Sequence, residues 1–141
     1  MKSKGIKVIL TDIDCTLIEY KGTAISRENM AKLQEAKKKG FRLYALSNTR
    51  NHRYKIVSMM LGIPVITGAR KPLQNGFRRI VKELKCRKQE MVMAGDRITA
   101  DIFGGNLFGI YTIYVKAIEK NAPLYYWLLL QFEKFMYWLF K

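Results

Sequence analysis

A short apolar run that ends in two carboxylates sets the strongest limit on how this chain can fold. Val8 to Leu10 is apolar, and Asp12 and Asp14 follow with one residue between them. An apolar run bounded by polar residues predicts a strand buried on both faces, as in a parallel sheet. Open α/β sheets place their chemistry where the chain leaves the carboxyl end of a strand. Two carboxylates this close repel each other, so their joint presence indicates a bound cation.

A second pair of aspartates follows another apolar run. Asp96 and Asp101 come after residues 90–94, and the sequence holds no aspartate beyond these two pairs. Most aspartates cap helices or form turns. Two doublets that each end a predicted central strand favour instead one site to which both pairs contribute.

Strand and helix signals alternate from residue 6 to residue 115. Strands are expected at 6–11, 41–46, 63–67, 90–94 and 110–115, and helices at about 27–39, 52–61, 72–85 and 99–108. Ser26 is a good N-cap, Gly40 and Gly62 suit helix ends, and Pro72 suits a first helical turn. The alternation predicts an α/β fold with right-handed crossovers and a five-stranded parallel sheet.

The strand order decides which side chains meet. We assume the order 3-2-1-4-5, whose switch point lies between strands one and four. That order would gather five side chains around one crevice: Asp12, Ser47, Lys71, Asp96 and Asp101.

Length and charge bound the class of protein and its partners. A chain of 141 residues is expected to form one domain with a core of its own. Its 26 Lys and Arg against 11 acidic residues give a net charge of +15. Such a balance favours anionic partners, whether nucleic acid, phospholipid headgroups or small phosphates, without choosing among them.

The cysteines and the N-terminus indicate a compartment. Cys15 and Cys86 make no disulfide framework, which fits a reducing environment. The first apolar run is too short for the core of a signal peptide. We therefore expect a protein in the cytoplasm, or one bound peripherally to a cytosolic membrane face.

Four segments resemble, in order, the four motifs of the haloacid dehalogenase (HAD) superfamily. They are Asp12-Ile13-Asp14-Cys15-Thr16, Ser47-Asn48, Lys71-Pro72, and Gly95-Asp96 with Asp101. The stretches 69–72 and 99–109 look closest to the small subfamily IIIA phosphatases of the YqeG type, a group similar to phosphatidylglycerophosphate phosphatases and in part consisting of them. The resemblance covers residues 6 to about 116 and implies a Rossmann-like phosphatase core.

The resemblance implies roles for the motif residues. Asp12 is expected to be the nucleophile that forms an aspartyl-phosphate, and Asp14 the general acid and afterwards the base. Ser47 would bind phosphoryl oxygens, and Lys71 would neutralise their developing charge. Further candidate substrate-binding side chains are Asn48, Arg50 and Arg97.

The implied cofactor is Mg²⁺, which prefers oxygen ligands in octahedral geometry. The family pattern implies ligands from the Asp12 carboxylate, the Asp14 backbone carbonyl and Asp96. Asp101 would contribute through a water or by orienting Lys71.

Two positions depart from the pattern of the relatives, which usually carry Asn at position 15 and Gln at position 97. Cys15 cannot make the hydrogen bonds of an asparagine. A buried, inert thiol is favoured there over an oxidation-sensitive one. Arg97 either adds positive charge beside the phosphate or is a solvated surface residue.

Spacing leaves no room for the cap domain with which HAD enzymes usually select substrates. Ser47 follows Asp12 by 35 positions and Lys71 follows Ser47 by 24, and each interval is used by one helix and its strand. An open site suits a phosphate presented on a large partner, or a site closed by oligomerisation.

The C-terminal segment is the main indication of a partner. We divide the chain into a core, 1–118, and a C-terminal aromatic amphipathic helix, 119–141. Residues 123–140 hold both tryptophans and eight of the seventeen aromatic residues. As a helix of about 27 Å this stretch is marginal for spanning a bilayer, whereas Trp, Tyr and flanking lysines suit an anionic membrane interface. The alternative is a helix packed in the core or against a sister subunit.

The sequence thus predicts a capless, Mg²⁺-dependent phosphatase acting on phosphatidylglycerophosphate at a membrane. A capless, oligomeric phosphatase for soluble sugar phosphates is one rival. A polynucleotide-end phosphatase is another, but no nucleic-acid module is present and no nucleic acid is expected as partner. A catalytically silent membrane adaptor is the rival outside the enzymes.

Overall fold

Five parallel strands form the centre of the molecule in the order β3-β2-β1-β4-β5. The structure, a computed structural model, describes residues 4–50 and 53–139. The strands are β1 (Val8–Thr11), β2 (Arg42–Leu46), β3 (Val65–Ile66), β4 (Met91–Gly95) and β5 (Tyr111–Tyr114). The predicted strand order and the parallel α/β class are confirmed, and no cap is inserted in the part of the chain that the structure describes.

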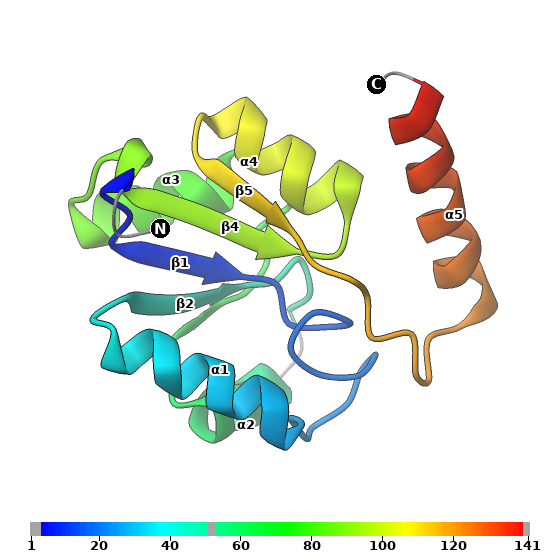
Figure 1. Cartoon of the computed structure of the whole chain (residues 1–141), viewed down its shortest axis with the longest axis horizontal. Helices are drawn as coiled ribbons and strands as arrows, with labels where there is room; N and C mark the ends of the chain where they lie inside the picture. Colours follow the sequence, from blue (N-terminus) through cyan, green and yellow to red (C-terminus); the bar gives the residue numbers. More distant parts are fainter. Residues whose placement is uncertain (1–3, 51–52, 140–141) are drawn as a thin grey trace.

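Helices cover both faces of the sheet (Figure 1). The helices α1 (Arg27–Lys38) and α2 (Arg53–Leu61) lie on one face, and α3 (Asn75–Leu84) and α4 (Phe103–Phe108) on the other. Ser26 caps α1 as predicted, since its Oγ accepts a hydrogen bond from the Asn29 amide. Each face has its own apolar cluster, one around Phe77 and Ile80 and one around Tyr54 and Val57.

The sheet register brings the ends of the central strands to one level. Thr11, the last residue of β1, pairs with Ala45 of β2 and Ala94 of β4. The Asp12 amide then donates to the Ala94 carbonyl at 2.9 Å. Asp12 and Asp96 therefore leave neighbouring strands side by side at the carboxyl edge of the sheet, where open α/β sheets bind ligands.

Some element bounds differ from the predictions. Helix α3 begins at Asn75 rather than at Pro72, because residues 70–73 form a turn closed by the Leu73 amide on the Arg70 carbonyl. The predicted helix 99–108 opens as a π-helical turn, Ile98–Ile102, before α4. The turn carries Lys71, and the π-helical turn carries Asp101. The predicted start of the second helix at His52 lies outside the described residues.

The last helix, α5 (Leu124–Leu139), stands off the carboxyl edge of the sheet (Figure 1). Its buried residues are Tyr126, Leu130 and Glu133. Their spacing of four and three places them on one helical face. The helix therefore contacts the core along one stripe, beside the ends of β1 and β4. Residues 140 and 141, which end the predicted C-terminal helix, lie outside the described residues.

Candidate active site

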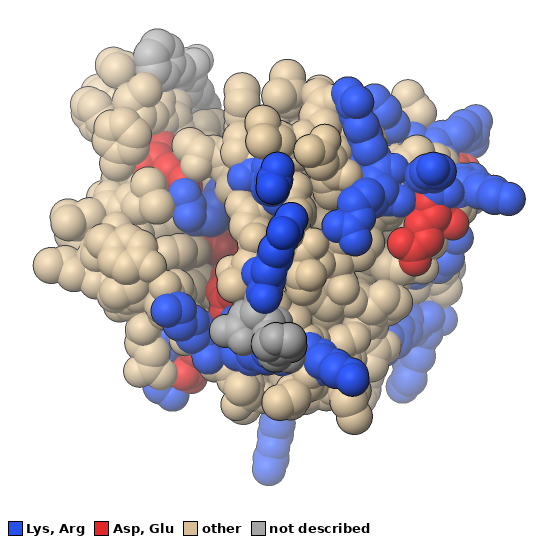
Figure 2. All heavy atoms as spheres, turned by 180° about the vertical axis from the view of Figure 1, so that it is seen from behind, with Lys and Arg blue, Asp and Glu red and all other residues tan. Residues whose placement is uncertain are grey.

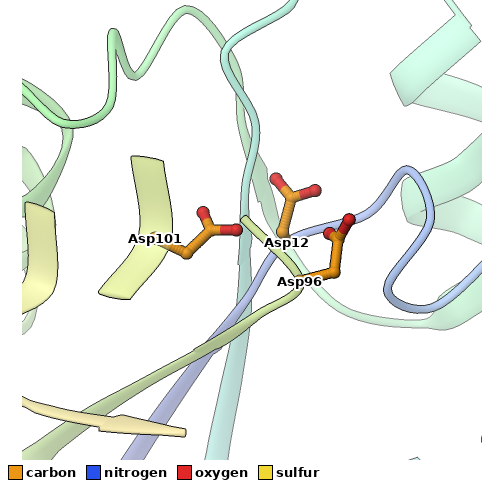
Figure 3. A group of neighbouring side chains, drawn as sticks. All are labelled: Asp12, Asp96 and Asp101. Carbon is orange, nitrogen blue, oxygen red and sulfur yellow. The ribbon is translucent and has the colours of Figure 1, made fainter. Parts of the chain in front are cut away.

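Three carboxylates converge where β1 and β4 end. Oxygen atoms of Asp12, Asp96 and Asp101 all lie within 4.8 Å of one another, and Figure 3 shows Asp101 pointing toward the other two. Asp101 comes from the π-helical turn. A Cβ on Gly95 would lie 2.2 Å from Asp101 Oδ2, so only glycine allows this approach.

Lys71 joins two of these carboxylates. Its Nζ donates to Asp12 Oδ1 at 2.5 Å and to Asp101 Oδ1 at 2.6 Å, and its side chain is 2% exposed. Burial alone would lower the pKa of Lys71, but the two carboxylates outweigh it and the net shift is upward. Lys71 therefore remains positively charged beside Asp12, the predicted nucleophile.

Asn48 fixes the backbone from which Lys71 projects. Its Oδ1 accepts from the Lys71 amide at 2.6 Å, and its Nδ2 donates to the Lys71 carbonyl at 2.9 Å. Both ends of the amide are thus engaged with the turn at residues 70–73. Asn48 lines the crevice described below, but these bonds give it a positioning task that the sequence did not reveal.

Burial raises the pKa of Asp12, while the Lys71 cation opposes this rise and the Asp101 and Asp96 carboxylates add to it. Crowded carboxylates with one neighbouring cation leave excess negative charge in the cluster. A bound metal ion would offset that charge.

Asp96 is held by two hydroxyl groups instead of a cation. Thr16 Oγ1 donates to its Oδ1 at 2.7 Å, and the Tyr126 hydroxyl of α5 donates to its Oδ2 at 2.5 Å. Burial raises the pKa of Asp96, and these two hydrogen bonds counteract the rise. Asp96 itself is 0% exposed, so both hydroxyls act on a fully enclosed side chain.

The Asp14 side chain points to the rim, away from the cluster. Its Oδ1 accepts from the Lys21 amide at 2.9 Å and from Arg53 at 2.6 Å, and its Oδ2 accepts from the Tyr54 hydroxyl. These donors fix its direction beside the crevice. The carboxylate lines the crevice described below, whereas its acid and base role and the metal contact through its backbone carbonyl stay predictions.

A crevice of about 220 Å³ lies over the cluster. Asp12, Asp14, Ser47 and Lys71 line it from the core, and Tyr125, Tyr126 and Leu129 line it from α5. Figure 2 shows red acidic atoms in the groove between the α5 lobe at the upper left and the rest of the molecule. The structure therefore gathers the predicted catalytic residues around one opening.

The predicted substrate-binding arginines lie in different places. Arg50 lines a separate hollow with Lys55 and Ser58, not the crevice. Arg97 lines the crevice, but its guanidinium donates to Glu133 of α5 at 2.7 and 2.9 Å. Neither of the two alternatives considered for Arg97 foresaw this ion pair. Contact of either arginine with substrate stays a prediction.

The cluster suits the hard divalent cation that the sequence motifs imply. All its donors are carboxylate oxygens, the ligand type that Mg²⁺ prefers. The crevice also leaves open space for the waters that Mg²⁺ usually retains. Asp12, Asp96 and Asp101 are the side chains that would hold the ion.

Comparison with known proteins identifies the family. Residues 3–109 match the model of the haloacid dehalogenase-like hydrolases. The chain belongs to this family. It is a HAD phosphatase, since its relatives in the family are phosphatases.

Two curated relatives and one solved structure support this placement. The HAD phosphatase is 36% identical over 121 residues to "Probable phosphatase YqeG" of Bacillus subtilis, with 86% of this chain and 70% of that protein covered. It is 29% identical over 103 residues to "Phosphatidylglycerophosphate phosphatase 1, chloroplastic" of Chlamydomonas reinhardtii, covering 73% of this chain and 34% of that longer protein. A HAD phosphatase from Thermococcus onnurineus superposes with a TM-score of 0.67 at 14% identity, covering 84% and 88% of the two chains.

Several residues of the site escaped the sequence analysis. Tyr126 and Glu133 lie in the aromatic segment for which a membrane interface, the core or a sister subunit was considered, and Tyr54 lies in the predicted helix 52–61; none of the three was given a role. Thr16 lies in a quoted motif but was given no role. The spacing of residues 126, 130 and 133 puts them on one helical face, but it does not reveal which side chains they contact.

Proposed function

We propose that this HAD phosphatase hydrolyses the terminal phosphate of phosphatidylglycerophosphate, with Mg²⁺, at a cytosolic membrane surface. One feature of α5 carries the proposal. The helix lends Tyr125, Tyr126 and Leu129 to the catalytic crevice and exposes apolar side chains on its other faces. A membrane that receives those faces would also present its headgroups beside the crevice. The similarity to a phosphatidylglycerophosphate phosphatase supports the same substrate class.

The crevice fits a headgroup rather than a whole lipid. Its volume of about 220 Å³ is below the range of pockets that enclose drug-sized ligands. A small phosphorylated headgroup could enter while the acyl chains stay outside. Because the described part of the chain inserts no cap over the site, the rest of a large substrate would meet no obstruction from such a domain.

The exposed surface of α5 has the composition of a membrane-interface helix. Trp127 is 44% exposed and Trp138 is 71% exposed, and Trp and Tyr favour the membrane interface. The other large exposed side chains of the helix are Leu124, Tyr125, Leu128, Phe132, Phe135, Tyr137 and Leu139. The net charge of +15 would favour an anionic surface. Within 4–50 and 53–139, no helix has the length and apolar character needed to cross a bilayer.

The first half of the reaction would form an aspartyl-phosphate. The Asp12 oxygen that is not bonded to Lys71 attacks phosphorus, and the bond to the glycerol oxygen breaks. That oxygen takes a proton from the Asp14 carboxyl group. The Ser47 hydroxyl binds a phosphoryl oxygen, and Lys71 neutralises the charge that develops on these oxygens. Asp12, Asp96 and Asp101 would hold Mg²⁺, which supplies further charge neutralisation there.

The second half would release the phosphate. The Asp14 carboxylate takes a proton from a water, the water oxygen bonds to phosphorus, and the bond to Asp12 breaks. Inorganic phosphate leaves, and Asp12 returns to its carboxylate form. Asp14 would thus alternate between acid and base from its position at the crevice rim.

The test is phosphate release from phosphatidylglycerophosphate in mixed micelles, with and without Mg²⁺, beside glycerol phosphate and sugar phosphates. Asp12→Asn should reduce turnover by roughly a thousand-fold or more, because an amide cannot accept the phosphoryl group. Circular dichroism should show an unchanged fold. Strong preference for the lipid that Asp12→Asn abolishes would support chemistry and substrate together.

Equal or better turnover of a soluble phosphate would retain the aspartate chemistry and reject the lipid substrate. The outer face of α5 would then fit a second copy of the chain, which light scattering would detect as a dimer. Turnover of no phosphomonoester by a protein that still binds Mg²⁺ would favour the silent adaptor.

A further inference from the structure

Helix α5 reaches the cation site with a single hydroxyl. Tyr126 is 7% exposed, and its hydroxyl donates to Asp96 Oδ2. Its ring packs against Tyr20 with centroids 5.6 Å apart. The ring of Tyr126 is thus enclosed between its own helix and the loop that carries Tyr20. Its hydroxyl has a defined direction toward Asp96.

The direction of Asp96 depends on two segments that are distant in sequence. Thr16, just past β1, fixes Oδ1, and Tyr126, from the far end of the chain, fixes Oδ2. Each carboxylate oxygen has two lone pairs, so one hydrogen bond still leaves a position for a metal ion. Outer groups of this kind orient ligands and strengthen metal binding. Asp12 and Asp101 differ because Lys71 orients both of them.

A second contact fastens α5 in this position. Glu133 is 1% exposed and accepts from the Arg97 guanidinium, the Ile98 amide and the Thr99 hydroxyl. Ile98 and Thr99 belong to the π-helical turn that carries Asp101. The same helix therefore contacts the segments that present two of the three clustered carboxylates.

We propose that α5 completes the cation site: Tyr126 is a positioning residue for Asp96, and Glu133 holds the helix where Tyr126 can act. The inference rests on the cation site of the proposed function but not on the lipid substrate. It explains why α5 carries a buried tyrosine and a buried glutamate on the face that meets the site. In this role α5 does not act as a cap domain. It forms part of the wall of the crevice and orients one of the residues that would hold the cation.

The decisive measurement is Mg²⁺ binding to the full chain by calorimetry, repeated with Mn²⁺ by electron paramagnetic resonance. Tyr126→Phe keeps the ring and removes the hydroxyl, and it should weaken cation binding about ten-fold. Activity should need correspondingly more Mg²⁺ and recover when Mg²⁺ is raised. Tyr137→Phe is the matched control on the same helix, since Tyr137 is 57% exposed, and it should bind Mg²⁺ as the wild type does.

Glu133→Gln tests whether Glu133 holds α5 in place. It should also weaken cation binding, and it should increase hydrogen exchange in α5. The double variant Tyr126→Phe/Glu133→Gln should weaken binding by less than the product of the two single effects, because both act through one contact. Independent effects of the two substitutions would contradict the role of Glu133.

The outcomes separate the inference from its foundation. The cation site itself would be rejected if the wild-type protein bound no cation, or if the Asp96→Asn variant bound it as tightly as the wild type. A wild-type protein that binds Mg²⁺ at Asp96, together with equal or tighter binding by Tyr126→Phe, would overturn the positioning role alone. A lower melting temperature of Tyr126→Phe with unchanged Mg²⁺ affinity would assign Tyr126 to packing and equally overturn it.

Discussion

The HAD core and helix α5 distribute apolar side chains in opposite ways. In the core, Phe77, Ile80 and Met93 are fully buried, and most of the buried charged side chains lie at the site. On α5 the buried residues include Tyr126 and Glu133, whereas Trp138 and Leu124 are each 71% exposed. The core is therefore held mainly by apolar burial, whereas α5 combines a small apolar contact through Leu130 with directed polar contacts. A helix attached in this way has a fixed orientation at the site and an apolar surface free for a partner.

Removing the buried charge of the core should have the largest effect on stability. Lys71→Met leaves Asp12 and Asp101 without their shared cation, and we expect a loss of about 3 kcal/mol, or about 10 °C in Tm. Mg²⁺ should restore part of this loss, because a bound cation offsets the same negative charge. Thermal unfolding with and without Mg²⁺ measures the loss of stability and its partial recovery.

Lys82→Met is the control for this substitution. Lys82 is exposed on α3, so its replacement should change stability by less than about 0.5 kcal/mol. A Tm of Lys71→Met equal to that of the control would show that the buried ion pairs contribute nothing to the folded core.

On α5 an apolar substitution should change binding rather than folding. Trp138→Ala removes the most exposed tryptophan and should weaken binding to anionic phospholipid vesicles about ten-fold, with Tm unchanged. Cosedimentation with vesicles measures the binding. Met59→Ala provides the comparison, because Met59 is 78% exposed on α2 of the core and should leave vesicle binding unaltered. Unchanged binding by Trp138→Ala would argue that another surface meets the membrane.

Much of the core was predictable because its signals are local. Strand and helix periods alternate along the chain and predict the parallel α/β class, whereas the strand order was assumed from the common orders of such folds and is confirmed. The motif order then places Asp12, Ser47, Lys71 and Asp101 around one crevice. The same local signals did not foresee the π-helical turn at 98–102 or the late start of α3 at Asn75.

The contribution of α5 was not predictable from local pattern. Eight aromatic residues in one segment do not reveal which ring faces inward, and nothing in the sequence pairs Glu133 with a partner. Its partners Arg97 and Thr99 lie more than thirty positions earlier. Arg53 and Tyr54 reach Asp14 across a similar separation. Such contacts depend on tertiary packing, and no spacing rule encodes them.

The smallest effect is expected at Cys15, which lies on the seam between the core and α5. Burial raises the pKa of its thiol to about 12, and Cys15 packs with Tyr126 and Leu130. At pH 8 the thiol is protonated and enclosed, so iodoacetamide should leave it unmodified in the folded protein and label it in urea. Because its cover is α5, Glu133→Gln should accelerate the labelling of Cys15 but not of Cys86, which is buried in the core. Mass spectrometry of the digested protein distinguishes the two cysteines. Equal acceleration at both would indicate general loosening of the fold, whereas a selective increase at Cys15 would show that α5 opens while the sheet stays closed.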